Sequence, residues 1–315
     1  HIMPRTAEIQ KLSHQFLPTD AVLTNWEGLE PYFKTLLAQD LDSVATLEKW
    51  LQNLSELEAF ISEDACWRQI KMTCDTTDKS LEESFNFFCM EIQPKMQPYA
   101  DALNKKLIAC PYTAQLNQSA YFTYLRSVKK SIELFREENI PIQAELSVLQ
   151  QQYGTIAGKM TIQFKEQEYT LQQAAQFLEN PDRAIREEVY LKIQERRLQD
   201  QTSMHDLFTS LIQKRNQVAI NAGFANYRDY KFQELGRFDY AKEDCYQFHD
   251  AIKLHVLPLI DKIYARKKKK LGLTTLKPWD TEAEPAGIEP LRPFTDGRDL
   301  LDKSIKCLDA LNPFF

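Results

Sequence analysis

The sequence predicts a mainly α-helical protein of long antiparallel helical hairpins with one small β-hairpin. Three observations lead to this fold class. Apolar residues recur at spacings of three and four along most of the chain, which is the period of an amphipathic helix. The 315 residues include only 8 glycines and few of the Pro-Gly or Asn-Gly pairs that close β-hairpins. One short stretch, residues 160–170, changes to the alternating period of a strand.

The composition narrows the classes of function. A hydrophobic content of 43% allows a substantial core, and 39 basic and 45 acidic residues are well mixed, so nothing global favours nucleic acid. The sequence shows no apolar run of transmembrane length and no signal peptide, so we expect no membrane partner. Six scattered cysteines without a CxxC spacing are typical of reduced thiols in a cytoplasmic protein: Cys66, Cys74, Cys89, Cys110, Cys245 and Cys307.

The first part of the chain predicts a helix followed by a helical hairpin. A helix is expected over residues 25–39. Apolar positions then step by three and four along residues 43–73 and again along residues 79–109. The turn between these two long helices is short and polar, so they should run antiparallel. Pro94 and Pro98 should bend the second helix, because neither has a backbone N–H to donate.

The middle of the chain contains the predicted β-hairpin. Two helices are expected before it, over residues 120–138 and 142–153. Residues 160–164 and 168–170 then read as two short strands joined by a polar turn. Because an isolated hairpin is marginally stable, it must pack on helices.

A short helix should follow the hairpin over residues 171–178. The next helix is expected to begin with Asn180 as its N-cap and Pro181 at its first helical position, and to end near Gln199. Both residue types are favoured at those positions because a helix start leaves backbone N–H groups without partners.

The most specific local signal is a helix corner between residues 204 and 229. Gly223 should end the first helix in a left-handed conformation, with Phe224 as the hydrophobic residue after it. Asn226 should cap a second helix over residues 227–235. The first helix carries six apolar residues on one predicted stripe: Leu207, Phe208, Leu211, Ile212, Val218 and Ala219.

The last part of the chain predicts a long helix, a proline-rich connection and a final helix. The long helix should span residues 241–269 with an interruption at Pro258, and the final helix residues 300–311. A basic run at 266–270 lies on the last turn, where the negative end of the helix dipole stabilises cations. We interpret it as a solvated helix end. Five residues are expected on the inner side of the long helix: Phe248, Ile252, Val256, Ile260 and Ile263.

These elements divide into three predicted regions. Residues 1–110 form a helical hairpin lobe, residues 111–180 a helical segment with the β-hairpin, and residues 181–315 the beginning of a further, incomplete helical domain. The chain stops at Asn-Pro-Phe-Phe, residues 312–315, which suggests an end within a domain.

No complete active site is evident. None of the five histidines (His1, His14, His205, His249 and His255) belongs to a His-Glu-x-x-His motif. His249 and His255 are six residues apart, roughly 240° around a helix, so they do not face one metal. Ser203, His205 and Asp206 have the identities of a catalytic triad, but their adjacency in sequence carries no weight. We therefore assign no catalytic and no metal-binding residue, and the substrate-binding residues remain unknown.

Several segments resemble one enzyme family. They are residues 180–190, residues 215–230, the Gly-Arg-Phe-Asp-Tyr of 236–240, and the Lys-Pro-Trp-Asp of 277–280 followed by Pro293-Phe294. With the β-hairpin between them, their order and spacing resemble the N-terminal part of the oligoendopeptidase F family of zinc metallopeptidases, relatives of thimet oligopeptidase. In that family the His-Glu-x-x-His motif, the third zinc ligand and the transition-state groups lie further along the chain, so none is carried over to this sequence.

The resemblance implies a function for the intact protein. It would be a cytoplasmic zinc-dependent oligoendopeptidase, a hydrolase that cleaves short peptides with metal-activated water. Residues 1–315 would form channel wall and scaffold of a zincin-like architecture truncated before the metal motif. This piece would hold no zinc, would be inactive alone, and would have the missing C-terminal catalytic segment as its partner.

Two other functions remain open. A non-catalytic helical interaction scaffold could use the hairpin of residues 43–109 to bind a partner, although no repeat of solenoid period is found. Nucleic-acid binding rests only on the basic run at 266–270, against an overall charge of −6.

Overall fold

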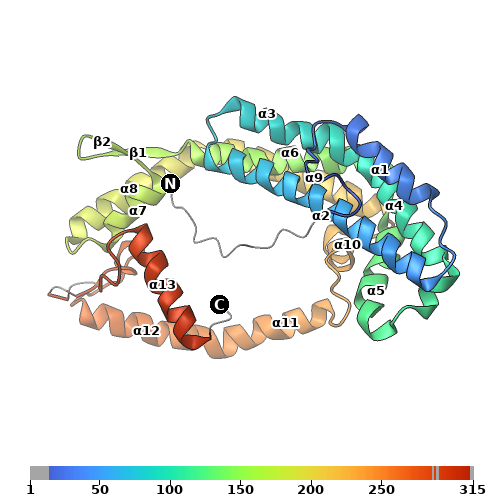
Figure 1. Cartoon of the computed structure of the whole chain (residues 1–315). Helices are drawn as coiled ribbons and strands as arrows, with labels where there is room; N and C mark the ends of the chain where they lie inside the picture. Colours follow the sequence, from blue (N-terminus) through green and yellow to red (C-terminus); the bar gives the residue numbers. More distant parts are fainter. Residues whose placement is uncertain (1–13, 286, 289–290, 313–315) are drawn as a thin grey trace. The chain divides into compact units, whose positions relative to one another are not determined.

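The computed structural model describes residues 14–285, 287–288 and 291–312. These residues form two units, each considered by itself. The larger contains residues 14–171 and 193–252, and the smaller contains residues 172–192 and the described part of 253–312. The secondary structure is helical apart from one two-stranded antiparallel sheet, so the predicted fold class is confirmed (Figure 1).

In the larger unit, long helices account for most residues. The first two begin one residue after the predicted starts, and the side chains of Asn25 and Ser43 cap them by accepting hydrogen bonds from the free N–H groups of Gly28 and Thr46. The helices are α1 (Trp26–Ala38), α2 (Val44–Cys74), α3 (Lys79–Phe87), α4 (Gln93–Ala109), α5 (Gln118–Leu134), α6 (Asn139–Gly158), α9 (Gln201–Asn221), α10 (Tyr227–Glu234) and α11 (Lys242–Ala251).

The main core of this unit lies where α1, α2 and α4 meet. Trp50 of α2 is fully buried, and its indole Nε1 donates a hydrogen bond to the Leu36 carbonyl at 2.9 Å. Lys106 of α4 donates to the carbonyls of Leu36, Leu37 and Gln39. The Lys106 ammonium thus satisfies carbonyls that the end of α1 leaves without partners. Its positive charge also interacts favourably with the negative end of the α1 helix dipole.

The predicted helix over residues 79–109 is interrupted by a turn of another helical type. A π-helical turn, Phe88–Ile92, separates α3 from α4, and Pro94 lies in the first turn of α4. Pro98 sits inside α4 without ending it. The extra residue of a π turn changes which side chains face inward. Here Phe88, Cys89 and Ile92 are all buried.

The β-hairpin closes with a tighter turn than predicted. Strand β1 (Thr161–Phe164) pairs with β2 (Gln167–Thr170), with Ile162 opposite Tyr169. The turn has two residues, Lys165 and Glu166, with φ of 50° and 62°. Positive φ at both positions gives the backbone twist that two-residue hairpins favour. Neither residue is glycine, so the sequence did not predict a two-residue turn at this position.

The predicted corner after α9 is confirmed. Gly223 has φ of 86°, the Gly223 N–H donates to the Ile220 carbonyl, and the Phe224 N–H donates to the Ala219 carbonyl, both at 2.9 Å. This pair of bonds is the Schellman arrangement. Asn226 then caps α10 by accepting from the Asp229 N–H.

Two side chains from another part of the larger unit hold this corner. Arg136 donates from Nε to the Asn221 carbonyl at 3.1 Å, and Asn139 donates to the Val218 carbonyl at 3.0 Å. Asn139 is 2% exposed, so its bonds are made without competition from water. The last turn of α9 is therefore fixed by Arg136 of the α5–α6 connection and Asn139 of α6, as well as by the glycine that follows it.

In the smaller unit, a buried carboxylate joins two distant segments. Its helical elements are α7 (Leu171–Ala175, of which Leu171 belongs to the larger unit), the first part of α8 (Arg183–Gln199), α12 (Leu257–Lys270) and α13 (Gly297–Leu311). Asp280 accepts from Arg183 and Arg186 of α8. The N-cap prediction for α8 was wrong. Asp182 caps it by accepting from the Ala184 N–H, and Asn180, just before the helix, instead accepts from the Asp182 N–H.

Burial corrects two of the predicted apolar stripes. In α9, Leu207, Leu211, Val218 and Ala219 are buried, but Phe208 and Ile212 are exposed. On the predicted long helix of residues 241–269, the residues expected inside are largely exposed: Phe248, Val256, Ile260 and Ile263. Periodicity marks an apolar face, but tertiary packing decides whether it is covered.

None of the described helices combines the length and apolarity needed to cross a bilayer.

Candidate functional site

A groove in the larger unit has a mainly apolar wall. It has a volume of about 440 Å³ and lies among α1, α2, the π turn with its flanking helices, and α6. This volume is within the range of about 300–1,000 Å³ typical of small-ligand pockets. Its apolar wall is formed mainly by Phe33, Leu54, Ile61, Phe85, Phe88 and Met96.

The groove contains one carboxylate, that of Glu58. Desolvation by the atoms that surround the carboxyl group raises the pKa of Glu58, although the residue as a whole is exposed to solvent. Among the described residues, no lysine, arginine or histidine forms an ion pair with it. The remaining polar groups of the wall are neutral amides, hydroxyls and thiols, including Gln93, Asn104 and Ser147. The groove therefore presents one uncompensated negative charge within an apolar surface.

Two neighbouring acidic groups of the larger unit are less readily ionised than usual. Burial raises the pKa of the Cys89 thiol to about 11. Burial, together with the charge of Glu58, raises the pKa of Tyr124 to about 12. Both groups stay neutral near pH 7, so they add no charge to that of Glu58.

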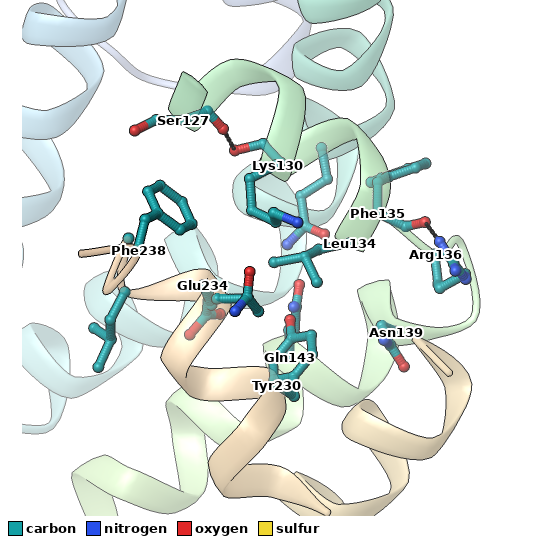
Figure 2. A pocket seen from close by; sticks show the side chains of 15 residues that line it. Ser127, Lys130, Leu134, Phe135, Arg136, Asn139, Gln143, Tyr230, Glu234 and Phe238 are labelled. Carbon is teal, nitrogen blue, oxygen red and sulfur yellow. Dashed lines mark hydrogen bonds between the residues drawn. The ribbon is translucent and has the colours of Figure 1, made fainter. Parts of the chain in front are cut away.

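A second cavity of the same unit, of about 310 Å³, lies between α5, α6 and α10 (Figure 2). It contains charged side chains, but they are already engaged. Lys130 pairs with Glu133, and Arg136 is held by backbone carbonyls, including that of Phe135. Burial, more than the nearby Glu234, raises the pKa of Tyr230 to about 12. Side chains that line this cavity, Arg136 and Asn139, hold the α9–α10 corner, so we assign the cavity to the packing of that corner and to no ligand.

In the smaller unit, the buried carboxylate of Asp280 is the most strongly perturbed acid. Burial by itself would raise its pKa, but hydrogen bonds from Arg183, the Lys277 backbone N–H and Arg186 outweigh that effect and hold the pKa at about 2. All of the bonding distances are 2.9–3.0 Å. Because every acceptor direction is occupied, this aspartate fixes the backbone and is not free for chemistry.

The residues weighed from sequence as candidates do not form a site. Ser203, His205 and Asp206 lie exposed on the first turns of α9. His249 and His255 are exposed, and the His14 ring bonds only to the nearby Pro18 carbonyl. His1 lies outside the described residues. Within the described ranges, no three His, Cys, Asp or Glu side chains are grouped as metal ligands would be.

Sequence reasoning missed Glu58, although a local signal was present. Glu58 is four residues after Leu54 and three before Ile61, so it interrupts the apolar stripe of α2. A charge at such a position is either paired or directed toward solvent. Only the structure shows that it lines a groove without a cation.

Two family models match successive regions of the chain. The peptidase M3 N-terminal domain matches residues 16–135, and peptidase family M3 matches residues 176–302. Together these regions account for most of the sequence, in the order expected for one protein. The chain therefore belongs to peptidase family M3. No curated protein sequence matches it.

Solved structures show which fold within this family the chain adopts. PZ peptidase A with an inhibitor matches 92% of this chain and 52% of its own, with a TM-score of 0.86 and 21% identity. A Bacillus anthracis protein assigned as an oligoendopeptidase F matches 93% and 54%, at 0.83 and 19%. Oligoendopeptidase F from Enterococcus faecium matches 92% and 57%, at 0.66 and 14%. The chain has the fold of about half of each of these structures.

Proposed function

We propose that this chain is the N-terminal part of a zinc-dependent oligoendopeptidase. The observation that carries the proposal is the match of two peptidase M3 models, in order, to residues 16–135 and 176–302. A fold shared with oligoendopeptidase F structures supports it. The expected activity is hydrolysis of short peptides, and the expected compartment is the cytoplasm.

The residues described here do not fit a zinc site. No group of three possible metal ligands occurs among residues 14–285, 287–288 and 291–312. As the resemblance to oligoendopeptidase F implies, we propose that the zinc ligands and the general base lie outside the described residues, and we derive no catalytic step from this chain. Zinc in a peptidase supplies an activated water and polarises the scissile carbonyl.

The proposed role of this chain is to shape access to that chemistry. Residues 1–110 would form a helical lobe and residues 111–180 its continuation with the β-hairpin, while residues 181–315 would begin the catalytic domain. Long, well-packed helices are suited to a channel wall because they are rigid and their side chains can exclude folded proteins.

The test compares two proteins with one quenched fluorescent peptide. The 315-residue chain should neither hold stoichiometric zinc nor cleave the peptide, whereas the longer reading frame should do both and lose activity with a chelator. Chelator-sensitive turnover by the 315-residue chain, free of contaminating protease, would contradict the assignment of the chemistry elsewhere. A longer protein that is folded, zinc-free and inactive would favour the non-catalytic interaction scaffold instead.

A further inference from the structure

The groove of the larger unit combines two features that together define a ligand. Its wall is aromatic and aliphatic, with Phe85, Phe88 and Met96 among the lining side chains. Its one charged group is the carboxylate of Glu58, which no cation of the described residues pairs. A carboxylate beside apolar surface attracts a cation that enters the same space, and a ligand that covers Glu58 would exclude part of the water that screens this exposed group.

We propose that this groove binds the N-terminal residue of short apolar peptides, with Glu58 accepting hydrogen bonds from the peptide's α-ammonium group. The choice of a peptide as ligand rests on the proposed peptidase function. The complementarity itself does not, because it follows from the charge and the lining of the groove. Glu58 is a binding residue in this proposal, remote from any bond that is broken.

An N-terminal residue meets both requirements of the groove at once. Its ammonium carries three donors and is protonated at neutral pH, since the ordinary pKa of an α-amino group is about 7.7–8.0. Its side chain branches from the same carbon, so an apolar side chain can contact Phe85 or Phe88 while the ammonium reaches Glu58. A lysine side chain would bring the charge at the end of a thin aliphatic stem and leave most of the aromatic wall uncovered.

The size of the groove agrees with a peptide end as the occupant. A cavity of about 440 Å³ is near the lower limit of ligand pockets, so it accommodates a residue or two and not an extended chain. Polar groups elsewhere on the groove wall, among them Gln93 and Asn104, can bond to the first peptide groups of such a ligand.

Direct binding to the 315-residue chain tests the proposal without any turnover. Isothermal titration would compare leucyl-phenylalanine amide with its N-acetylated form, which lacks the ammonium, and with glycyl-glycine amide, which lacks the apolar side chains. N-acetyl-phenylalanyl-lysine amide carries its only cation on the side chain. The free apolar dipeptide amide should bind at least about tenfold more tightly than the other three, the gain expected for a charge-assisted hydrogen bond.

Variants of the same helix provide the matched comparison. Glu58→Gln keeps the shape of the side chain, and should weaken the free dipeptide amide by about tenfold while leaving the weak binding of the acetylated form unchanged. Glu63→Gln, an exposed position of α2 outside the groove, should change neither. Equal unfolding temperatures would show that both variants are folded.

Three results would overturn the proposal: equal binding of free and acetylated dipeptides, tighter binding of the lysine peptide, or no binding by the folded chain at millimolar ligand. Failure of the peptidase function appears separately. If the longer protein shows no turnover while the 315-residue chain still binds the free dipeptide more tightly than the acetylated one, the proposed function is refuted and the proposed site is not.

Discussion

The replacement Asp280→Asn examines the buried ion cluster of the smaller unit. Asparagine keeps the shape of the side chain but removes the charge and replaces one accepting oxygen by an NH₂ donor. Asp280 is 0% exposed and accepts from Arg183 at 2.9 Å, from Arg186 at 3.0 Å and from the Lys277 N–H at 2.9 Å. In the variant, two guanidinium groups face a neutral amide, and at least one buried donor loses its acceptor.

The magnitude follows from the same contacts. Breaking a buried ion pair by changing one partner costs about 3–5 kcal/mol. The Arg183 side chain is 40% exposed and can recover hydration, whereas that of Arg186 is 4% exposed and cannot. The lower part of that range, about 3 kcal/mol, is therefore expected. A pKa of about 2, against 3.8, independently corresponds to about 2 kcal/mol.

Hydrogen exchange is the suitable assay because it reports on this unit separately. The amides of Lys277, Ala283 and the first turns of α8 should exchange roughly 30- to 150-fold faster in the variant. Asp299→Asn, which removes a partly exposed ion pair with Lys303 in the same unit, should cost no more than about 1 kcal/mol. Equal effects of the two replacements would refute the reasoning, since burial would then make no difference.

The same carboxylate predicts a dependence on pH. The folded pKa of Asp280 lies below its unfolded value, so its contribution to stability is complete above about pH 4 and is lost as the pH falls toward 2. In Asp280→Asn, exchange at residues 277–283 should lose this acid dependence. An unchanged acid dependence in the variant would assign it to another group.

Three further predictions concern the glycine at the corner after α9, the buried Asn139 and the thiols of the larger unit. Gly223→Val should lower the free energy of unfolding by about 1–2 kcal/mol from its positive φ alone, because no atom lies within 4 Å of the added Cβ. Gly154→Ala, equally open but in a helix, should raise it by about 0.5–1 kcal/mol, and denaturant unfolding measures both changes. A cost of Gly223→Val below a few tenths of a kcal/mol would show that the corner is built differently. Asn139→Ala should cost about 1–3 kcal/mol by leaving buried groups unpaired, and a neutral result in the same assay would contradict that bonding. Cys89, with its pKa of about 11, should be alkylated far more slowly at pH 8 than the exposed Cys66, measured by mass spectrometry; comparable rates would mean that Cys89 is accessible.

Comparison of the predicted and observed elements shows which features are local. The cap at Asn226 and the left-handed Gly223 were predicted, because each depends on backbone groups within a few residues. The caps at Asn25 and Ser43 are local in the same way, although they were not assigned from the sequence. The long helices were predictable for a similar reason, since the spacing of their apolar residues can be read from the sequence alone. The family resemblance likewise rested on short segments, and two family models confirm it.

Features that depend on distant residues could not be obtained in this way. Arg183 and Asp280 are 97 positions apart, and their pairing requires two segments to meet. Periodicity placed Phe208 on the inner stripe of α9, but the structure leaves it exposed. The π turn Phe88–Ile92 adds a residue that the regular period does not contain.

The sequence by itself determined the helices, the β-hairpin and the sharp corner after α9, because these follow from local hydrogen bonding and apolar period. The tertiary structure decided which apolar faces are covered, which charges are paired and where a groove remains. Glu58 illustrates the difference: its place on α2 is a matter of sequence, but its lack of a partner among the described residues depends on what packs around it. Burial and pairing are properties of the whole assembly of helices, so no single segment encodes them.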